Sequence, residues 1–229
     1  MSSRQYRLSF CRKESPAIDA TFEQSWSQTL SGGAYALDFV NTLDWRGREQ
    51  PVETLHQYAD FLRFALASGV IDLRQAKSLL AWAVRHPKRS AKALERAKST
   101  RETVALLVKA RSKGEALPRA ALARLEEDAR DAWKARSLVP QGLVARWQWA
   151  EGDPDPDLPR WAAALDAARL VTGEEHGPIR ECEGADCGWF FLDESRNRRR
   201  RWCSMEACGN RAKARRFYRR KRAASAPSA

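Results

Sequence analysis

The stretch that decides the fold runs CEGADCGWFFLDESRNRRRRWCSMEACGNR over residues 182–211. It holds two cysteine pairs of equal spacing, Cys182-x4-Cys187 and Cys203-x4-Cys208, separated by fifteen residues. Two close pairs on a hairpin-sized spacer are typical of a tetrahedral zinc site, because each turn supplies two thiolates and the spacer brings the two turns together. Four protein thiolates leave no coordination position for water, so we expect one structural zinc ion.

Two disulfides or an iron–sulfur cluster would use the same four cysteines. An iron–sulfur cluster also takes four thiolates and remains the alternative to zinc. Disulfides are disfavoured because residues 1–16 lack the apolar run of a signal peptide, which predicts a cytoplasmic protein whose thiols stay reduced. A module of about 45 residues is near the size at which a hydrophobic core alone is marginal. Zinc binding is therefore expected to stabilise the module.

The residues around the cysteines predict a β-hairpin followed by a helix. Gly188 comes directly after the first pair, where a turn that presents two thiolates needs positive φ. Residues 189–192 alternate in the manner of a short strand, and residues 200–202 are expected to return beside them as a second strand. Ser204 is a predicted cap of the helix that begins at Met205. This order of elements predicts a treble-clef-like zinc finger.

The net charge of the chain is concentrated in the same region. Among 229 residues, 41 Lys and Arg oppose 29 Asp and Glu, for a net charge of +12. Residues 196–222 contain 13 basic residues and one acidic residue, so the rest of the chain has 28 of each sign. A neutral body with a cationic tip is typical of a protein that binds a phosphate-rich partner. Binding to a membrane surface is the alternative. No stretch approaches the roughly 18 apolar residues that a spanning helix needs.

A helix over residues 205–222 would carry most of these cations. A helix fits the major groove of B-DNA, where Arg reads guanine and Asn reads adenine, so Asn210, Arg211 and Arg215 are candidates for base contact. The other cations are expected to meet phosphates. RNA or nonspecific binding is the alternative, and an acidic protein partner is a weaker one. The predicted nucleic-acid-binding residues are Arg198, Arg199, Arg200, Arg201, Asn210, Arg211, Lys213, Arg215, Arg216, Arg219, Arg220 and Arg222.

Upstream of the finger the apolar residues mostly recur three or four apart, which predicts amphipathic helices around one core. Asp72 and Gln75 are placed as the capping box of one of them. Residues 34–40 fit a helix and a strand almost equally, and residues 143–150 alternate as a half-buried strand. We expect a mainly α fold with a small β component, divided into an arm of uncertain order (1–30), a helical domain (31–175), the zinc finger (179–222) and a disordered tail (223–229).

The helical domain shows no set of nucleophile, base and orienting residue and no glycine-rich phosphate loop. An enzyme is therefore the weak alternative. A domain that senses a small-molecule effector, or that forms a homodimer, fits better. Asn41, Asp44 and Arg46 are candidate effector-binding residues, because polar groups near the end of an element often line a pocket. The alternative is that Asn41 and Asp44 cap a helix or turn.

Two motifs resemble known families. The segment at residues 203–211, preceded by Cys182-x4-Cys187-Gly188-Trp189-x-Phe191-x-Asp193, closely resembles the CGNR zinc-finger family. The segment ALDFVNT at residues 36–42 is similar to the opening of the ABATE domain that accompanies such fingers. The resemblance covers roughly residues 31–222. It implies a bacterial transcription regulator whose finger is the DNA-binding module.

Overall fold

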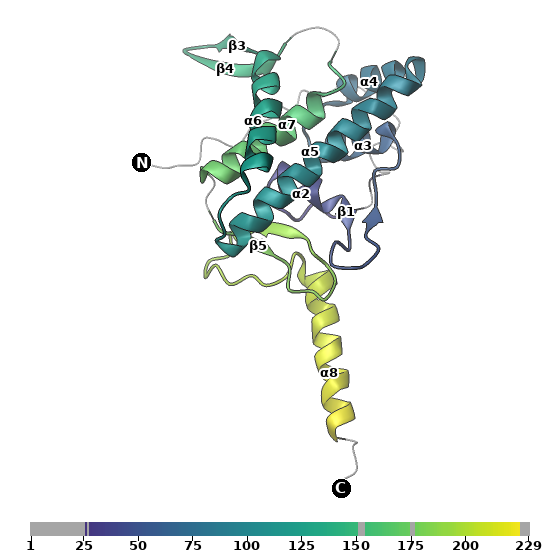
Figure 1. Cartoon of the computed structure of the whole chain (residues 1–229), viewed down its shortest axis with the longest axis vertical. Coiled ribbons are helices and arrows are strands. Elements are labelled where there is room, and N and C mark those ends of the chain that lie inside the picture. Colours follow the sequence, from purple (N-terminus) through teal and green to yellow (C-terminus); the bar gives the residue numbers. More distant parts are fainter. Residues whose placement is uncertain (1–25, 27, 151–153, 175–176, 225–229) are drawn as a thin grey trace.

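The computed structural model describes residues 26, 28–150, 154–174 and 177–224 (Figure 1). Most of the arm expected at 1–30 lies outside this part of the chain, as do residues 225–229 of the expected tail. Residues 223 and 224 continue the last helix instead of belonging to a tail. Among the described helices, none combines the length and the apolar character that crossing a bilayer requires.

The described residues form a mainly α structure with small antiparallel ladders, as predicted. The helices are α2 (Tyr35–Asn41), α3 (Tyr58–Ala67), α4 (Leu73–Arg85), α5 (Pro87–Lys113), α6 (Arg119–Lys134), α7 (Leu158–Thr172) and α8 (Asn210–Ala224). The strands pair as β1 (Leu43–Asp44) with β2 (Val52–Glu53), β3 (Arg136–Gln141) with β4 (Val144–Trp149), and β5 (Ile179–Glu181) with β6 (Phe190–Leu192).

Local signals explain where several helices begin and end. The predicted capping box at the start of α4 is present, with Asp72 accepting from the Gln75 backbone N–H at 2.8 Å. The long helix α5 has Pro87 in its first turn and ends at Gly114, whose φ of 69° is favourable only for glycine. Residues 35–41 form a helix and not a strand. Ala36, Leu37, Phe39 and Val40 are all buried, and this nearly continuous apolar run explains why the periodicity of the segment is ambiguous.

The β3–β4 hairpin differs from the expected single strand at 143–150. Its first strand was missed because residues 136–141 lack a two-residue alternation and contain Pro140, which is unfavourable inside a sheet. The turn is made by Gly142, with φ of 65°, and Leu143. The hairpin is mostly exposed rather than half-buried, because it extends from the end of α6 and does not lie on the core (Figure 1).

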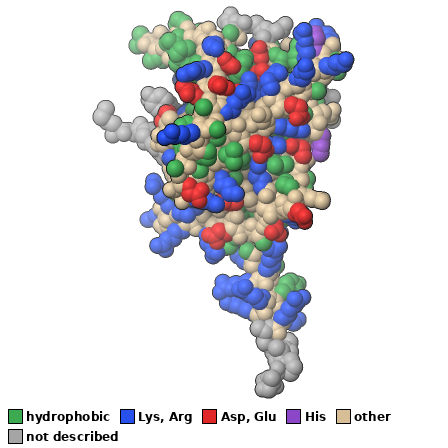
Figure 2. Space-filling view, in the orientation of Figure 1, with side chains coloured by type: hydrophobic (Ala, Val, Ile, Leu, Met, Phe, Trp, Pro, Cys, Tyr) green, Lys and Arg blue, Asp and Glu red, His purple; other side chains and the backbone are tan. Residues whose placement is uncertain are grey.

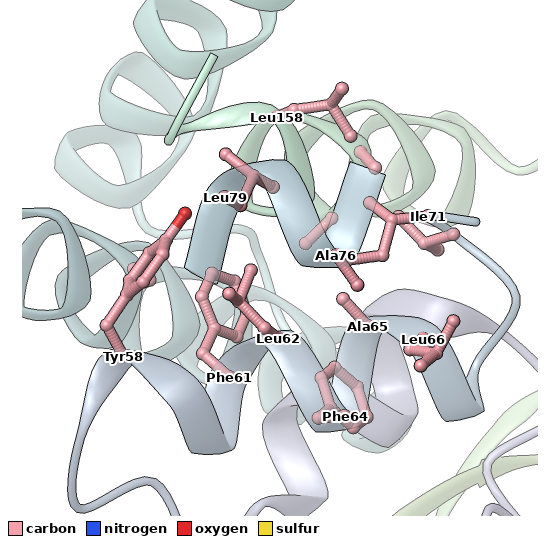
Figure 3. Close-up of a cluster of buried hydrophobic side chains, with 14 of the residues drawn as sticks. Tyr58, Phe61, Leu62, Phe64, Ala65, Leu66, Ile71, Ala76, Leu79 and Leu158 are labelled. Carbon is pink, nitrogen blue, oxygen red and sulfur yellow. The ribbon is translucent and has the colours of Figure 1, made fainter. Parts of the chain in front are cut away.

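Two hydrophobic clusters join the helices. The first contains Phe61 and Phe64 and joins α3 to α4, and it also includes Leu158 of α7, which Figure 3 shows on the other side of α4. The second gathers side chains of α2, α5 and α7, including Leu107 and Leu170. Ile179, Phe190 and Leu192 belong to this second cluster, so β5 and β6 of the finger share the core of the helical domain.

The finger hairpin is formed by other residues than expected. Strand β6 pairs with β5, and residues 200–202 form no strand. Asp193 explains the difference: its fully buried carboxylate accepts hydrogen bonds from Ser195, from the Arg200 backbone N–H and from the Arg180 side chain. These bonds close residues 193–200 into a loop around one buried anion, so the chain does not turn back as a strand.

Candidate metal centre and the helix attached to it

The four cysteines of the finger lie together and are all buried, with every Sγ within 4.8 Å of the others. The Sγ atoms of Cys187 and Cys203 are 3.8 Å apart, and those of Cys203 and Cys208 are 3.7 Å apart. A tetrahedral zinc ion with Zn–S bonds of about 2.3 Å requires S–S separations of about 3.8 Å. The cluster therefore has the dimensions of a four-thiolate zinc site and can hold one structural ion, as predicted.

The surroundings of the sulfurs favour a bound cation. The backbone N–H groups of Cys203 and Gly184 donate to Cys182 Sγ at 3.3 and 3.4 Å. Hydrogen bonds from the thiols of Cys187 and Cys203 lower the pKa of Cys182, and its sulfur in turn raises the pKa of both neighbours. Four sulfurs this close cannot all ionise together without a cation among them.

Glycines bring the first cysteine pair close to the second. The knuckle, by which we mean residues 182–188, connects β5 to β6. A Cβ at Gly184 would lie 2.8 Å from Cys208 Sγ, so only glycine allows this approach without displacement. Gly188 has φ of 67°, which confirms the predicted positive φ.

The second pair begins a helix. Ser204 Oγ accepts from the Ala207 backbone N–H at 3.2 Å, which confirms the predicted cap. Cys208 lies in a single π-helical turn, Met205–Gly209, that leads directly into α8. The metal site therefore fixes the N-terminal end of α8.

Helix α8 projects away from the rest of the molecule along its long axis (Figure 1). Its sequence NRAKARRFYRRKRAA holds eight Lys or Arg and no acidic residue. In Figure 2, blue side chains lie on both sides of the projecting rod, with green hydrophobic side chains beside them. Phe217 and Tyr218 are each 63% exposed, with ring centroids 5.6 Å apart. The two residues form an apolar pair inside a cationic run of the sequence.

The residues predicted to contact nucleic acid fall into two groups, those on α8 and the arginines at 198–201. The cations from Lys213 to Arg222 are exposed on α8. Arg200 instead faces inward: its guanidinium donates to the carbonyls of Trp202, Cys203 and Ser31 and lies 4.3 Å from the Phe191 ring centroid.

The other three arginines of this segment, Arg198, Arg199 and Arg201, also have contacts within the finger. Arg201 pairs with Glu183 of the knuckle at 2.5 Å, and the carbonyl of Arg198 accepts from Arg180. Arg199 is exposed, and its backbone N–H donates to Ser195. The spacing of these arginines does not predict the contacts of Arg198 and Arg201, because their partners Arg180 and Glu183 each lie 18 positions away along the chain.

The three candidate effector-binding residues lie where the helical domain meets the finger. Asn41 exchanges two hydrogen bonds of 2.9 Å with the backbone N–H and C=O of Phe190. Asp44 Oδ1 accepts from the Trp189 indole N–H at 2.8 Å. Both side chains therefore bind the finger, and an effector contact at these positions stays a prediction.

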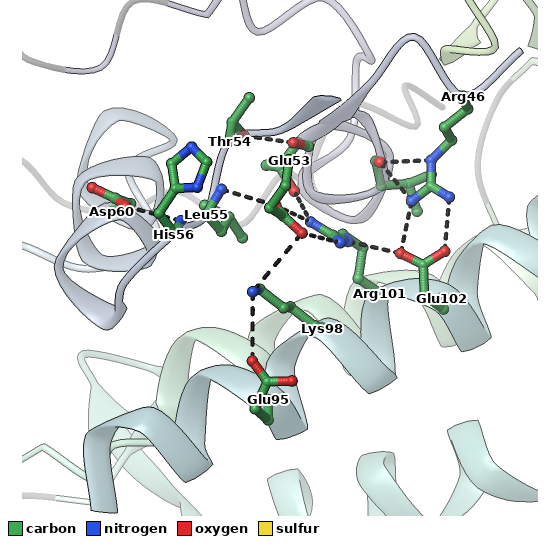
Figure 4. Close-up of polar contacts among 12 residues, drawn as sticks. Arg46, Glu53, Thr54, Leu55, His56, Asp60, Glu95, Lys98, Arg101 and Glu102 are labelled. Carbon is green, nitrogen blue, oxygen red and sulfur yellow. Dashed lines mark hydrogen bonds and ion pairs between the residues drawn. The ribbon is translucent and has the colours of Figure 1, made fainter. Parts of the chain in front are cut away.

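Arg46 belongs to a chain of ion pairs that fixes the loop between β1 and β2 (Figure 4). It donates to the Val40 carbonyl and forms two hydrogen bonds to Glu102, at 2.8 and 3.1 Å. The neighbouring Arg101, only 3% exposed, binds Glu53 in the same way. Burial opposes ionisation of Glu53, but the hydrogen bonds and charge of Arg101 outweigh it and lower the pKa of that carboxyl group.

The loop fixed in this way, residues 44–48, packs on the knuckle and on α8. A Cβ at Gly47 would lie 2.9 Å from the Asp186 Cα, and one at Gly188 would lie 2.7 Å from the Arg46 Cβ. The Trp45 ring lies under two guanidinium groups, with the Arg48 Cζ 3.6 Å and the Arg211 Cζ 4.8 Å from its centroid. Sequence reasoning missed this contact, which joins residues more than 150 positions apart.

These features define a class of protein: a four-cysteine zinc finger packed on a helical domain, with a cationic helix beginning at the metal site. Comparison with family models agrees with this class. The model for the CGNR zinc finger matches residues 179–221, and the ABATE model, described as "Putative stress-induced transcription regulator", matches residues 33–174. The chain belongs to the ABATE family and carries a CGNR zinc finger, as the resemblance implied. No curated protein matched the chain.

Proposed function

We propose that the protein is a zinc-dependent transcription regulator that binds duplex DNA through α8. One observation carries the proposal: eight cations and no anion lie on an exposed helix whose first residues follow a metal ligand directly. Cations of one sign on a rod attract a polyanion. The ligand at the start of the helix gives that rod a fixed direction.

The distribution of cations around α8 suits a groove with phosphate on both walls. Arg215, Arg219 and Arg222 follow one side at helical spacing, and Lys213, Arg216 and Arg220 follow another. An α-helix fits the major groove of B-DNA, where an arginine can also read guanine. Of the three residues proposed to read bases, Arg215 is exposed and free to reach a groove, whereas Asn210 Nδ2 donates to the Glu206 carbonyl at 3.2 Å.

The test is a titration of labelled random-sequence duplex DNA with the zinc-loaded chain at several salt concentrations. Each phosphate contact contributes about −0.9 to the slope of log K against log salt, so about six contacts predict a slope near −5. Arg219→Ala should reduce the magnitude of the slope by about 0.9. Arg130→Ala is the matched control, since this exposed arginine lies on α6 of the helical domain, where it pairs with Glu126. Absence of binding, or binding insensitive to salt, would reject the proposal.

RNA or nonspecific single-strand binding is the second candidate, and the exposed Phe217–Tyr218 pair favours it. Aromatic side chains in a cationic groove stack on unpaired bases, a contact worth about 1–3 kcal/mol per base. Competition of the bound duplex by a single-stranded oligonucleotide of equal length separates the candidates. Our proposal predicts that the duplex binds more tightly and that Phe217→Ala affects single-strand binding more than duplex binding.

For the helical domain we propose a role in sensing or assembly and not in catalysis. Its family description names a regulator, which supports this assignment. A small-molecule effector, a homodimer and a cytoplasmic location are parts of the proposal, and a DNA partner supports that location. Sedimentation of the zinc-loaded chain tests the dimer. Native mass spectrometry after incubation with cell extract tests retention of a small molecule.

A further inference from the structure

Arg211 occupies a different environment from the other cations of α8. It lies in the first turn of the helix, where its guanidinium donates to Cys208 Sγ at 2.9 Å and lies over the Trp45 ring. One side chain thus contacts a metal-ligating sulfur and a tryptophan of the helical domain. Arg215, one turn further on, is exposed as Arg211 is, so the two contacts are what distinguish Arg211.

Contacts other than the one with Arg211 also fix the position of Trp45. Its φ of 54° is uncommon for a bulky residue and persists only where the surroundings enforce it. Its backbone N–H donates to Asp44 Oδ1 at 2.8 Å, and the same oxygen accepts from the Trp189 indole of the finger. Arg48 lies over its ring, and Glu102 holds the adjacent Arg46.

We propose that Trp45 and Arg211 form a joint that fixes the direction of α8 relative to the helical domain and shields the sulfur of Cys208. Arg211 is then a positioning residue and does not read bases, because turning toward DNA would break both of its contacts. Trp45 acts through Arg211. The part of this inference that concerns DNA rests on the proposed function; the part that concerns the metal site does not.

The joint has a consequence at the metal. A hydrogen bond to a ligand atom tunes the metal site, and its loss typically lowers metal affinity about 10–100-fold. Arg211→Ala removes that bond directly. Trp45→Ala removes the surface against which the guanidinium rests, so the bond to Cys208 Sγ is weakened and not deleted.

The first measurement is the rate of zinc release from the full chain to a chromogenic chelator. We expect Arg211→Ala to release zinc about 10-fold faster or more, Trp45→Ala to release it several-fold faster, and Trp45→Phe, which keeps an aromatic face for the guanidinium, to remain near wild type. The matched control Arg215→Ala should be unchanged. The double variant of Trp45 and Arg211 should be no faster than Arg211→Ala alone. Additive effects, or release from Arg211→Ala at the wild-type rate, would overturn the joint.

The second measurement is the salt dependence of duplex binding. Arg211→Ala should bind more weakly with an unchanged salt slope, whereas Arg215→Ala should lose about 0.9 of the slope. Circular dichroism of each zinc-loaded variant verifies that it is folded. An equal loss of slope in both variants would make Arg211 a phosphate contact and overturn the inference. If the wild-type chain binds no duplex, the proposed function fails, while zinc release still decides whether the joint exists.

Discussion

Replacing Asn41 with Ala should loosen the finger from the helical domain. Strand β6 pairs with β5 along one edge, and the helical domain covers its other edge: the Leu192 N–H donates to the Gly32 carbonyl, and the Phe190 N–H donates to Asn41 Oδ1. Asn41 is 2% exposed and also donates to the Phe190 carbonyl. Its truncation leaves one buried donor and one buried acceptor of the backbone without a partner.

The expected loss follows from these two bonds. A buried hydrogen bond contributes about 1 kcal/mol net, and a partner left unsatisfied adds a penalty, so the free energy of unfolding should fall by about 3 kcal/mol. For a domain of this size each 1 kcal/mol lowers the melting temperature by about 2–4 °C, which predicts a loss of about 6–12 °C.

Thermal unfolding of the zinc-loaded chain, followed by circular dichroism, measures this loss. The matched control is Asn210→Ala, the same truncation at an exposed position, which should change the free energy of unfolding by less than about 0.5 kcal/mol. A melting temperature for Asn41→Ala within 2 °C of wild type, allowing about 1 °C of error, would refute the reasoning that this side chain holds the finger.

Three further variants test other parts of the structure. Cys203→Ser should abolish stoichiometric zinc and duplex binding together, measured by metal analysis and anisotropy; retention of one zinc per chain would contradict the cluster. Arg160→Met removes the cation bonded to the buried carboxylate of Asp128 at 2.5 Å and leaves it only the longer ion pair with Arg124, at 3.6 Å, so the chain should be destabilised by about 3 kcal/mol in urea unfolding. Burial raises the pKa of Asp38 to about 6, above its unfolded value, so its ionised form opposes folding above that pH. The melting temperature of Asp38→Asn should therefore exceed that of wild type at pH 7, and the difference should narrow toward pH 4; a constant difference would argue against it.

Features set by short-range spacing could be predicted from the sequence. The two cysteine pairs, the cap at Ser204 and the capping box at Asp72 each depend on residues a few positions apart, and the structure confirms all of them. The same holds for the mainly α fold, because helical periodicity is a local property.

Features set by distant residues could not be predicted. Arg200 turns inward because Asp193 is buried, and Asn41 binds Phe190 across 149 positions of the chain. The strand β5 is three residues long and shows no alternation that could have revealed its pairing with β6. Such contacts depend on how the finger packs on the helical domain, and spacing within one segment carries no information about that packing.

The most direct test of the central claim is duplex binding by one preparation with its zinc removed and then restored. Our account predicts steeply salt-dependent binding by the zinc-loaded chain, loss of binding when a chelator removes the metal, and recovery on adding zinc back. The charge of the α8 side chains is the same whether zinc is bound, removed or restored. Equal affinity with and without zinc would show that charge alone binds the duplex, and would contradict the claim that the metal site orients the helix.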